Sequence, residues 1–348
     1  MIDLTNKRIC LIGGAGFIGH HLALALQQLG AKVEIIDSLQ VNNLLSFAYG
    51  NYEEENRDLY SQMVNQRFDL LRQHKIPIEV QDARDYHAMS RIIDEIKPNV
   101  IVHLAAVAHA ARSNKDPMST FDHSLRTLEN ALDCARGTVE HFIYFSSSMV
   151  YGNFEGGKVS EDTVCNPIGI YGALKYAGEK IVIAYNQVFD LPYTIIRPSA
   201  LYGERCVSRR VGQVFIENTL RGKTVKINGD GSDALDFTYI EDLVQGIVKT
   251  IQTEKSKGEI FNLTYGRARS INEMSEILRQ EISDVKIQHL PKDKLMPDRG
   301  TLNVEKARSI LGYEPQFPLE KGFVKYINWY KSLGEITGWK ENLEPVLK

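Results

Sequence analysis

Residues 8–37 constrain the fold of this chain more than any other stretch. They read as a short apolar strand (Arg8–Ile12), a glycine-rich turn, a helix that runs to Leu29, and a second strand (Lys32–Ile36) that ends at Asp37. A unit of strand, helix and strand places its two strands side by side and parallel, with the helix packed on the sheet. We therefore predict an α/β fold built on a doubly wound parallel sheet.

The glycine-rich turn has the spacing that brings a dinucleotide close to the backbone. Gly13 permits the tight turn, Gly16 lets a pyrophosphate approach, and Gly19 lets the helix pack against the strand. The helix N-terminus then offers free N–H groups to the phosphates. Asp37, 18 positions after Gly19, can bind both ribose hydroxyls and repel a 2′-phosphate. We predict a Rossmann-like domain that binds NAD rather than NADP, through Gly13, Gly16, Phe17, Ile18, Gly19 and Asp37.

Further strands and helices alternate along the chain. Pro77–Val80, Val100–Leu104 and Phe142–Phe145 read as strands with helices between them. After a strand at Tyr193–Ile196 the alternation weakens. We expect residues 1–190 to form mainly the NAD-binding domain and residues 191–348 mainly a smaller C-terminal α/β lobe that binds the substrate, with some strands and helices crossing between the lobes.

The carboxyl ends of the later strands supply more candidates, because ligands bind at that edge of such sheets. Small residues after the fourth strand would let the backbone lie close to the cofactor. We predict cofactor contacts at Asp82, Ala83, Leu104, Ala105 and Ala106. His109 and Arg112 lie in the following loop and are candidates for contacting the substrate.

The second and third strands are joined by an unusually long connection, residues 39–76. Glu53–His74 within it has apolar residues at helical spacing among many charges. One interpretation is an amphipathic surface helix packed on the sheet edge. The alternative is a lid or a subunit contact.

Tyr171 and Lys175 would lie one turn apart on the same face of a helix. The ammonium, with the positive ring of an oxidised nicotinamide, would favour the phenolate of a tyrosine whose pKa is normally about 10. Such a tyrosine can take the proton of a sugar hydroxyl while hydride leaves the same carbon. The strand ending at Phe145 brings Ser146–Ser148 to the same edge, so a serine hydroxyl could pass the proton along.

Charge and cysteine usage narrow the class of protein. The 348 residues carry a formal net charge of −3, which gives no electrostatic case for nucleic acid or an anionic membrane. No apolar run approaches the length that crosses a bilayer, and the charged start is not typical of a signal peptide. The cysteines lie far apart, without metal or disulfide spacing: Cys10, Cys134, Cys165 and Cys206. We predict a cytoplasmic protein without a metal site.

With these motifs in place, the chain resembles the extended short-chain dehydrogenase/reductase family, specifically its nucleotide-sugar epimerases and dehydratases. The resemblance covers roughly residues 8–330. The motifs occur in the family's order: Gly-Gly-Ala-Gly-Phe-Ile-Gly at 13–19, Asp37, Asp82, His-Leu-Ala-Ala at 103–106, Ser-Ser-Ser-Met-Val-Tyr-Gly at 146–152, Tyr171 and Lys175 with Ala-Gly-Glu at 177–179, Arg197-Pro198 with Tyr202-Gly203, Gly-Asp-Gly at 229–231, Asp-Phe-Thr-Tyr-Ile-Glu-Asp at 236–242, and Lys306-Ala307 with Leu311-Gly312-Tyr313 and Pro315.

That resemblance implies roles for several residues. Ser147 matches the Ser/Thr of a catalytic triad, Tyr171 its base, and Lys175 the residue that lowers the pKa of the base and holds the nicotinamide ribose. Asp82 matches an acid beside the adenine. Family members keep NAD bound, oxidise a sugar hydroxyl, usually at C4, and often return the hydride. The resemblance further implies a nucleotide-diphosphate sugar as substrate and a homodimer formed through a helix bundle.

The two residues after Ser147 discriminate among the family's reactions. In the 4,6-dehydratases they are an Asp and a Glu that protonate the leaving hydroxyl and remove the C5 proton, and the decarboxylases keep the Glu. Here they are Ser148 and Met149, and a thioether is neither acid nor base at neutral pH. We therefore predict 4-epimerisation through a transient 4-keto sugar, with Ser148 and Met149 beside the substrate. Another acid or base could still enter from a different loop, with His109 and Cys165 as candidates.

The chain also departs from the family where the substrate is usually held. Ala200 replaces a common asparagine and Leu235 a common arginine. The cations for the diphosphate must then come from elsewhere, and a guanidinium can bind phosphate with two parallel hydrogen bonds. The candidates are Arg209, Arg210 and Arg299, of which Arg299 lies where the family often has a phosphate-contacting arginine.

Other functions remain open at this point. A dehydratase, a C3/C5 epimerase or a net oxidoreductase would act on a similar substrate. A net oxidoreductase would consume or produce free NADH, whereas an epimerase needs NAD only in catalytic amount. The remote alternative is a non-catalytic NAD-binding regulatory protein, which the loss of Tyr171 or Lys175 would have supported.

Overall fold

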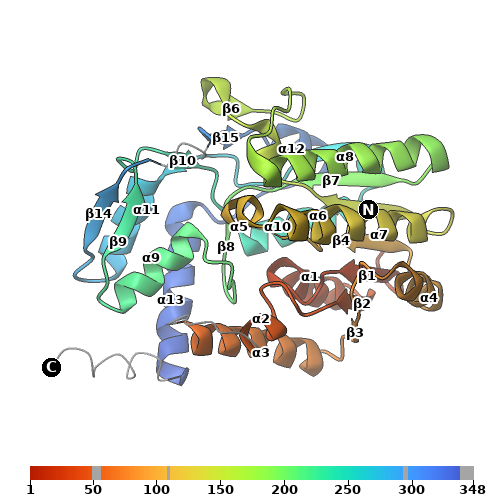
Figure 1. Ribbon diagram of the computed structural model, residues 1–348, viewed down its shortest axis with the longest axis horizontal. Coiled ribbons are helices and arrows are strands. Elements are labelled where there is room, and N and C mark those ends of the chain that lie inside the picture. The colour runs from red at the N-terminus through yellow and green to blue at the C-terminus, as the bar shows by residue number, and fades with distance from the viewer. Residues whose placement is uncertain (49–55, 108–109, 293–296, 338–348) are drawn as a thin grey trace.

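A computed structural model describes residues 1–48, 56–107, 110–292 and 297–337, and a seven-stranded parallel sheet lies at its centre (Figure 1). The strand order is β12-β7-β5-β4-β1-β2-β3. The strands are β1 (Arg8–Ile12), β2 (Lys32–Asp37), β3 (Ile78–Val80), β4 (Val100–His103), β5 (His141–Phe145), β7 (Tyr193–Arg197) and β12 (Glu259–Asn262). The predicted doubly wound α/β fold is confirmed, and β12 is a strand that the sequence pattern did not reveal.

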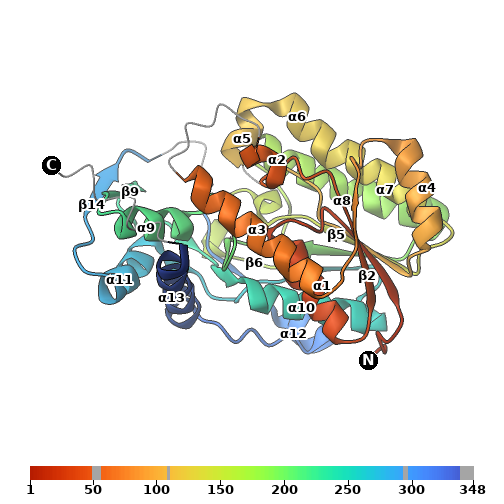
Figure 2. The ribbon, with the colours of Figure 1, turned by 90° about the horizontal axis from the view of Figure 1, so that it is seen from below.

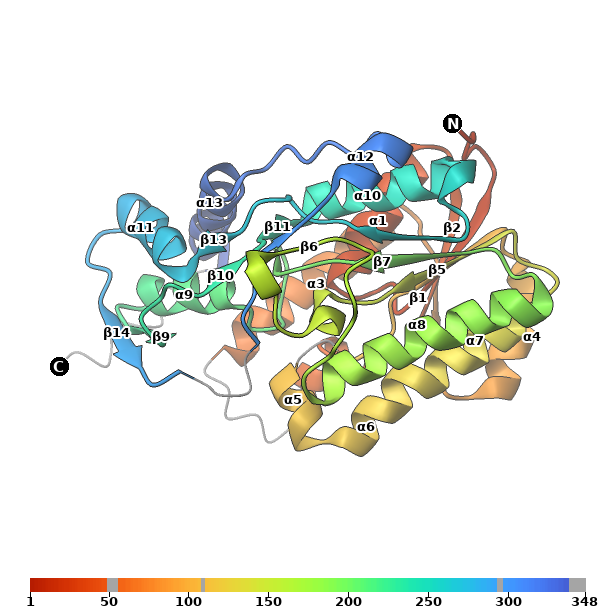
Figure 3. The same ribbon diagram turned by 90° about the horizontal axis from the view of Figure 1, so that it is seen from above.

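Alternate residues of β1 show how two layers of helices enclose the sheet. Ile9 and Leu11 pack in the same cluster as α1 (Phe17–Gln28) and α10 (Ile240–Gln252). Cys10 and Ile12 point to the other face and pack with the helices α4 (Tyr86–Ile96), α7 (Thr127–Ala135) and α8 (Gly169–Phe189). Figures 2 and 3 show the two groups of helices on opposite sides of the sheet. Both faces are therefore buried, as an all-parallel sheet requires.

A smaller lobe follows the carboxyl end of β7. The chain enters it through β8 (Leu201–Tyr202), which pairs with β11 (Thr238–Tyr239). Its helices and longer strands lie together at one end of the molecule (Figures 1 and 3): α9 (Val211–Leu220), α11 (Ile271–Glu281), α13 (Leu319–Thr337), β9 (Val225–Asn228) and β14 (Ile287–Leu290).

The remaining elements are short. The helices are α2 (Leu44–Ala48), α5 (Ala110–Lys115), α6 (Pro117–Phe121) and α12 (Glu305–Leu311), with a π turn at Asp122–Arg126 and 3-10 turns at Ser148–Tyr151, Glu155–Gly157 and Glu254–Ser256. The strand pairs are β6 (Lys158–Val159) with β15 (Thr301–Leu302), and β10 (Ala234–Leu235) with β13 (Arg269–Ser270). Within the described residues, no helix combines the length and apolar character needed to cross a membrane.

Two strands from beyond residue 190, β7 and β12, belong to the central sheet. The helix α10 also packs against α1, on the face of the NAD-binding half. Segments after residue 190 therefore also belong to the half that contains the central sheet. The boundary at residue 190 stays a prediction for the main part of each lobe.

The long connection after β2 forms the amphipathic helix α3 (Arg57–Gln73), beginning after residues 49–55, which lie outside the described part. Tyr60, Met63 and Leu71 on its inner face are buried in the main core cluster. The helix packs on α1, and one of its ends lies near α9 of the smaller lobe (Figure 2). There the Tyr60 hydroxyl donates to Glu217 of α9. It thus joins the two lobes and does not simply cover the sheet edge.

Candidate active site

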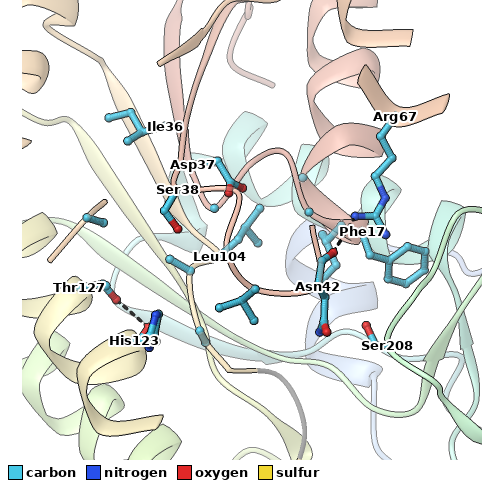
Figure 4. Close-up of a pocket in the computed structure, with 18 of the residues that line it drawn as sticks. Phe17, Ile36, Asp37, Ser38, Asn42, Arg67, Leu104, His123, Thr127 and Ser208 are labelled. Atoms are coloured by element: carbon cyan, nitrogen blue, oxygen red, sulfur yellow. Dashed lines mark hydrogen bonds between the residues drawn. The ribbon is translucent and has the colours of Figure 1, made fainter. Parts of the chain in front are cut away.

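A cleft lies at the carboxyl end of the sheet (Figure 4). It is lined by all the residues that we predicted to bind the cofactor, except those on α8. They come from the β1–α1 turn and from the ends of β2, β3 and β4. They are Gly13, Gly16, Phe17, Ile18, Gly19, Asp37, Asp82, Ala83, Leu104, Ala105 and Ala106. The structure brings these residues together, while their contact with NAD stays a prediction.

The glycine turn fits a phosphate-binding role. Gly13 has a φ of 79°, and a Cβ there would lie 2.7 Å from the backbone nitrogen of Ala105. A Cβ on Gly19 would lie 2.3 Å from the carbonyl oxygen of Gly14, so only glycine permits this helix to approach the turn. Gly16 caps α1 without a side-chain hydrogen bond, which leaves the N–H groups of the first turn available to a pyrophosphate.

Asp37 is fixed beside this turn by the backbone. Its carboxylate accepts hydrogen bonds from the N–H groups of Ala15, at 3.0 Å, and Leu39, at 2.8 Å. Burial raises the pKa of Asp37, and these two bonds act in the opposite direction. Each carboxylate oxygen keeps a further lone pair, so the group can still accept from ribose hydroxyls.

Asp82 lies in a different environment, at the end of β3. Arg84 donates to both of its oxygens, with a shortest distance of 2.6 Å. These hydrogen bonds lower the pKa of Asp82 against a smaller effect of burial. The carboxylate is therefore held in place, beside the cleft, by a neighbour two residues along the chain.

The cleft also contains residues that sequence reasoning missed. Arg67 of α3 is buried and donates to the carbonyl oxygens of Arg205, at 3.0 Å, and Asn42, at 3.2 Å (Figure 4). These partners are distant in sequence, so no local pattern marks Arg67. The other missed residues are Ile36, Ser38, Val41, Asn42, Gln81, His123, Thr127, Leu201 and Ser208. Gln81 could have been proposed from its position next to Asp82.

The three consecutive serines at the end of β5 bind three different partners. Ser146 donates to Glu179 at 2.5 Å, in the interior. Ser147 Oγ accepts from the N–H of Met149 at 3.2 Å, and the Ser147 hydroxyl is placed so that it lowers the pKa of Tyr171. Ser148 accepts from Arg299 at 2.6 Å. Of the three, Ser147 is thus the hydroxyl that could relay a proton to or from Tyr171.

Tyr171 lies at the start of α8, next to the turn that contains Met149. A Cβ on Gly172 would lie only 2.7 Å from the carbonyl oxygen of Met149, which shows how closely the two segments approach. Burial raises the pKa of Tyr171, while Arg210, the hydrogen bond with Ser147 and Arg299 lower it. The charges that favour the phenolate in this structure are therefore two arginines.

Lys175 is buried one turn further along α8. Its Nζ donates to the carbonyl oxygen of Phe145 at 2.6 Å and lies 5.1 Å from the centre of the Tyr144 ring. Burial lowers the pKa of Lys175 to about 8, and Glu179 opposes this shift. The predicted effect of Lys175 on Tyr171 stays a prediction, because the interactions seen here link the ammonium to the end of β5.

Two family motifs without an assigned role form a buried ion pair behind the site. Arg197, at the end of β7, donates to both oxygens of Glu179 on α8, at 2.9 and 2.7 Å. Their side chains are 3% and 1% exposed. A buried pair with this bidentate geometry fixes α8 relative to β7 and thereby the position of Tyr171.

The predicted substrate residues are distributed around this centre. Arg299 contacts Ser148 and Met149, and Arg210 lines the cleft. The backbone N–H of Arg209 donates to Gln213 on α9. His109 lies outside the described residues, and Arg112 is placed only as a member of α5.

Cys165, the other candidate acid or base, packs against a small apolar cluster that includes Tyr151. Burial raises the pKa of its thiol, so the thiolate needed for proton abstraction is disfavoured.

Comparisons with known proteins show which sequences and folds this chain is similar to. The model of the NAD dependent epimerase/dehydratase family matches residues 9–264. UDP-glucose 4-epimerase of Mycolicibacterium smegmatis is 30% identical, over 93% of this chain and 99% of that protein. The structure of UDP-glucose 4-epimerase from Thermotoga maritima with UDP-glucose has a TM-score of 0.80 at 27% identity, covering 94% of this chain and 99% of that one. UDP-glucuronic acid 4-epimerase from Bacillus cereus, in complex with UDP-glucuronic acid and NAD, also has a TM-score of 0.80 at 27% identity, covering 94% and 100%.

Proposed function

This chain belongs to the NAD dependent epimerase/dehydratase family, and from this premise we propose that it catalyses the 4-epimerisation of a nucleotide-diphosphate sugar with NAD as its cofactor. The 4-epimerases among its relatives support this reaction and favour a UDP-sugar as substrate. The glycine turn, the uncapped start of α1 and Asp37 line one cleft, as NAD binding requires.

The observation that favours epimerisation over dehydration is the chemistry of Ser148 and Met149. Both side chains are buried, and both contact the cation Arg299. Neither can protonate a leaving hydroxyl as a carboxylic acid would, nor remove the C5 proton as a carboxylate would. An enzyme without these groups can still oxidise C4, let the keto sugar turn, and reduce it from the other face.

NAD, when bound, supplies a hydride acceptor and, in its reduced form, a hydride donor. The residues of the chain manage the proton. We assign Tyr171 as the base that takes the proton of the C4 hydroxyl, with Ser147 relaying it. On the return step, the same phenol gives a proton to the C4 oxygen. Lys175 would hold the nicotinamide ribose, and the Glu179–Arg197 pair keeps α8 in register with β7.

We further propose that the protein is a cytoplasmic homodimer. Apolar side chains are exposed on two helices of the same layer, Met118 and Phe121 on α6 and Val188 and Phe189 on α8. Exposed apolar side chains on two helices of one layer suit a helix-bundle contact between two copies. The cysteines carry free thiols, which a reducing compartment maintains. Sedimentation at several protein concentrations would show a monomer if the dimer proposal is wrong.

The reaction is tested by incubating the protein with UDP-, dTDP- and GDP-sugars and following the ring protons by NMR. We expect inversion of one ring stereocentre in one of these sugars, approach to equilibrium from either epimer, and no lasting NADH absorbance. A reaction without the protein is the control. A 4-keto-6-deoxy product would identify a dehydratase, and stoichiometric NADH would identify a net oxidoreductase.

A further inference from the structure

We propose that Arg299 binds a carboxylate carried by the sugar ring, so that the preferred substrate is a nucleotide-linked hexuronic acid. The inference rests on the proposed epimerase function and identifies the class of sugar. The sequence made Arg299 a candidate for binding the nucleotide diphosphate. The present inference assigns it to the sugar carboxylate instead.

The first observation is where the Arg299 side chain ends. Its segment precedes β15, yet the guanidinium reaches the turn after β5 and the loop after β7. One terminal nitrogen, Nη2, donates to Ser148 Oγ at 2.6 Å and to Ser199 Oγ at 2.8 Å. The other lies 3.2 Å from Met149 Sδ. Two separate segments, the turn after β5 and the loop after β7, therefore hold this charge.

The second observation is that this cation has no anionic partner of its own. Within the described part of the chain, no carboxylate lies within ion-pair distance of Arg299. Asp236 attracts it from a greater distance. The carboxylate of Asp236 instead accepts from Thr264 and from the N–H groups of Gly266 and Leu302.

Arg197 in the same region shows the contrast. Its guanidinium is matched by both oxygens of Glu179, so its charge is neutralised within the protein. A guanidinium in a partly buried site without such a match is unfavourable unless a ligand supplies the anion. Burial lowers the pKa of Arg299 to about 10, because a buried positive charge without a matching anion is disfavoured.

The third observation is a set of hydrogen-bond donors around the guanidinium. The oxygens of Ser148 and Ser199 both accept from Arg299, so their own hydroxyl hydrogens can be donated to a third group. The Nε–H of Arg299 is buried and has no partner among the described residues. One cation and two hydroxyl donors match the acceptor-only chemistry of a carboxylate.

Arg299, Ser148 and Ser199 together form what we call the carboxylate receptor. Its position relative to Tyr171 decides whether it binds the carboxylate or the diphosphate of such a substrate. The reacting C4 hydroxyl must lie within hydrogen-bond reach of Tyr171. Arg299 is close enough to Tyr171 to lower its pKa, and Met149, which Arg299 contacts, lies against Gly172 next to Tyr171, so this group of donors adjoins the reacting carbon. The carboxylate of a hexuronic acid is attached to C5, the neighbour of C4. The diphosphate is attached through C1, across the ring.

The test measures binding in the NAD-loaded Tyr171→Phe protein, in which turnover is blocked. UDP-glucuronate, UDP-glucose and UDP are titrated by calorimetry against this protein and against the same protein carrying Arg299→Gln. We expect UDP-glucuronate to bind about 10- to 100-fold more tightly than UDP-glucose, as charge-assisted hydrogen bonds allow. Arg299→Gln should abolish that preference and change the affinity for UDP by less than about threefold. Equal weakening of all three ligands would place Arg299 on the diphosphate and overturn the proposal.

Two further variants distinguish loss of the proposed contact from a folding defect. Ser199→Ala removes one hydroxyl donor without touching the charge, and should weaken UDP-glucuronate by about three- to tenfold while leaving UDP-glucose unchanged. An unchanged affinity for UDP-glucuronate would contradict the receptor. Arg279→Gln, on the exposed face of α11, is the matched control. Bound NAD and melting temperature verify each protein.

Turnover by the wild-type protein separates this inference from the proposed function. Epimerisation of UDP-glucose with no preference for UDP-glucuronate would overturn the proposed carboxylate receptor and support the proposed epimerase function. Selective binding of UDP-glucuronate without epimerisation of any nucleotide sugar would support the receptor and overturn the proposed reaction.

Discussion

Ser146, Ser147 and Ser148 have the same side chain and three different tasks in this site. Ser146 donates to a buried carboxylate, Ser147 accepts from the backbone of Met149 and lowers the pKa of Tyr171, and Ser148 accepts from the guanidinium of Arg299. The resemblance assigned the relay to Ser147, and that role stays a prediction. The partner of Ser148 is a cation, so the position that holds an acid in the dehydratases is adjacent to a positive charge here.

Tyr171→Phe should remove the base without removing the cofactor site. The ring of Phe can occupy the same place at the start of α8, while the proton acceptor is lost. We expect turnover to fall by about 10²- to 10⁴-fold, the usual contribution of a general base, with bound NAD unchanged. Turnover and the NAD released on denaturation measure the two effects. Tyr176→Phe, elsewhere on α8, is the matched control, and near-normal turnover of Tyr171→Phe would place the base elsewhere.

At the scale of elements, α3 is the least expected component. A buried carboxylate, Glu217 on α9, accepts hydrogen bonds from Tyr60 and Asn56 at the start of α3, from Gln213, and from Tyr330 on α13. Burial raises the pKa of Glu217, and the hydrogen bonds from Gln213, Tyr330 and Tyr60 lower it. One side chain thus links an inserted helix to two helices of the smaller lobe.

Tyr60→Phe tests whether this link stabilises the protein. The substitution removes one donor to Glu217 and keeps the ring in the core. We expect the free energy of unfolding to fall by about 1–3 kcal/mol, because a buried carboxylate oxygen loses a hydrogen bond. Urea unfolding measures the change. Tyr86→Phe, whose exposed hydroxyl binds Asp133 at the surface, should cost less than about 0.5 kcal/mol. Equal effects of the two substitutions would mean that the Glu217 network adds no stability.

The elements that sequence predicted best are those whose signal is local. The β1–α1–β2 unit is confirmed because glycines, apolar periodicity and a terminal acid all lie within 30 residues. The edge strand β12 was missed because its four residues, Glu259–Asn262, lack a distinctive pattern and are recruited by pairing with β7. Arg67 and the partners of Arg299 were missed for a related reason: each contact joins segments more than 20 residues apart, which no periodicity records.

At the scale of the whole molecule, the core contains histidines from a helix, α1, and from two strands, β4 and β5. His20, His103 and His141 are each at most 2% exposed. Burial is the largest cause that lowers the pKa of each, and those of His103 and His141 fall to about 3. Below a pH of about 6.5 these histidines are therefore protonated in the unfolded chain but stay neutral in the folded protein. The stability due to these histidines is fully present above that pH and decreases as the pH falls toward 3.

His141 allows this coupling to be isolated. Its Nε2 lies 2.8 Å from Thr194 Oγ1, and Thr194 itself donates to the carbonyl oxygen of Ser256, so His141 is the donor to Thr194. Glutamine can supply a similar N–H but has no proton to gain. Between pH 6.5 and 5.5, wild type should therefore lose about 1 kcal/mol of unfolding free energy more than His141→Gln does, and about 1.4 kcal/mol more over the next pH unit. Urea unfolding at several pH values measures the difference, with the exposed His87→Gln as control. Parallel pH curves for wild type and His141→Gln would show that His141 takes up its proton in the folded state.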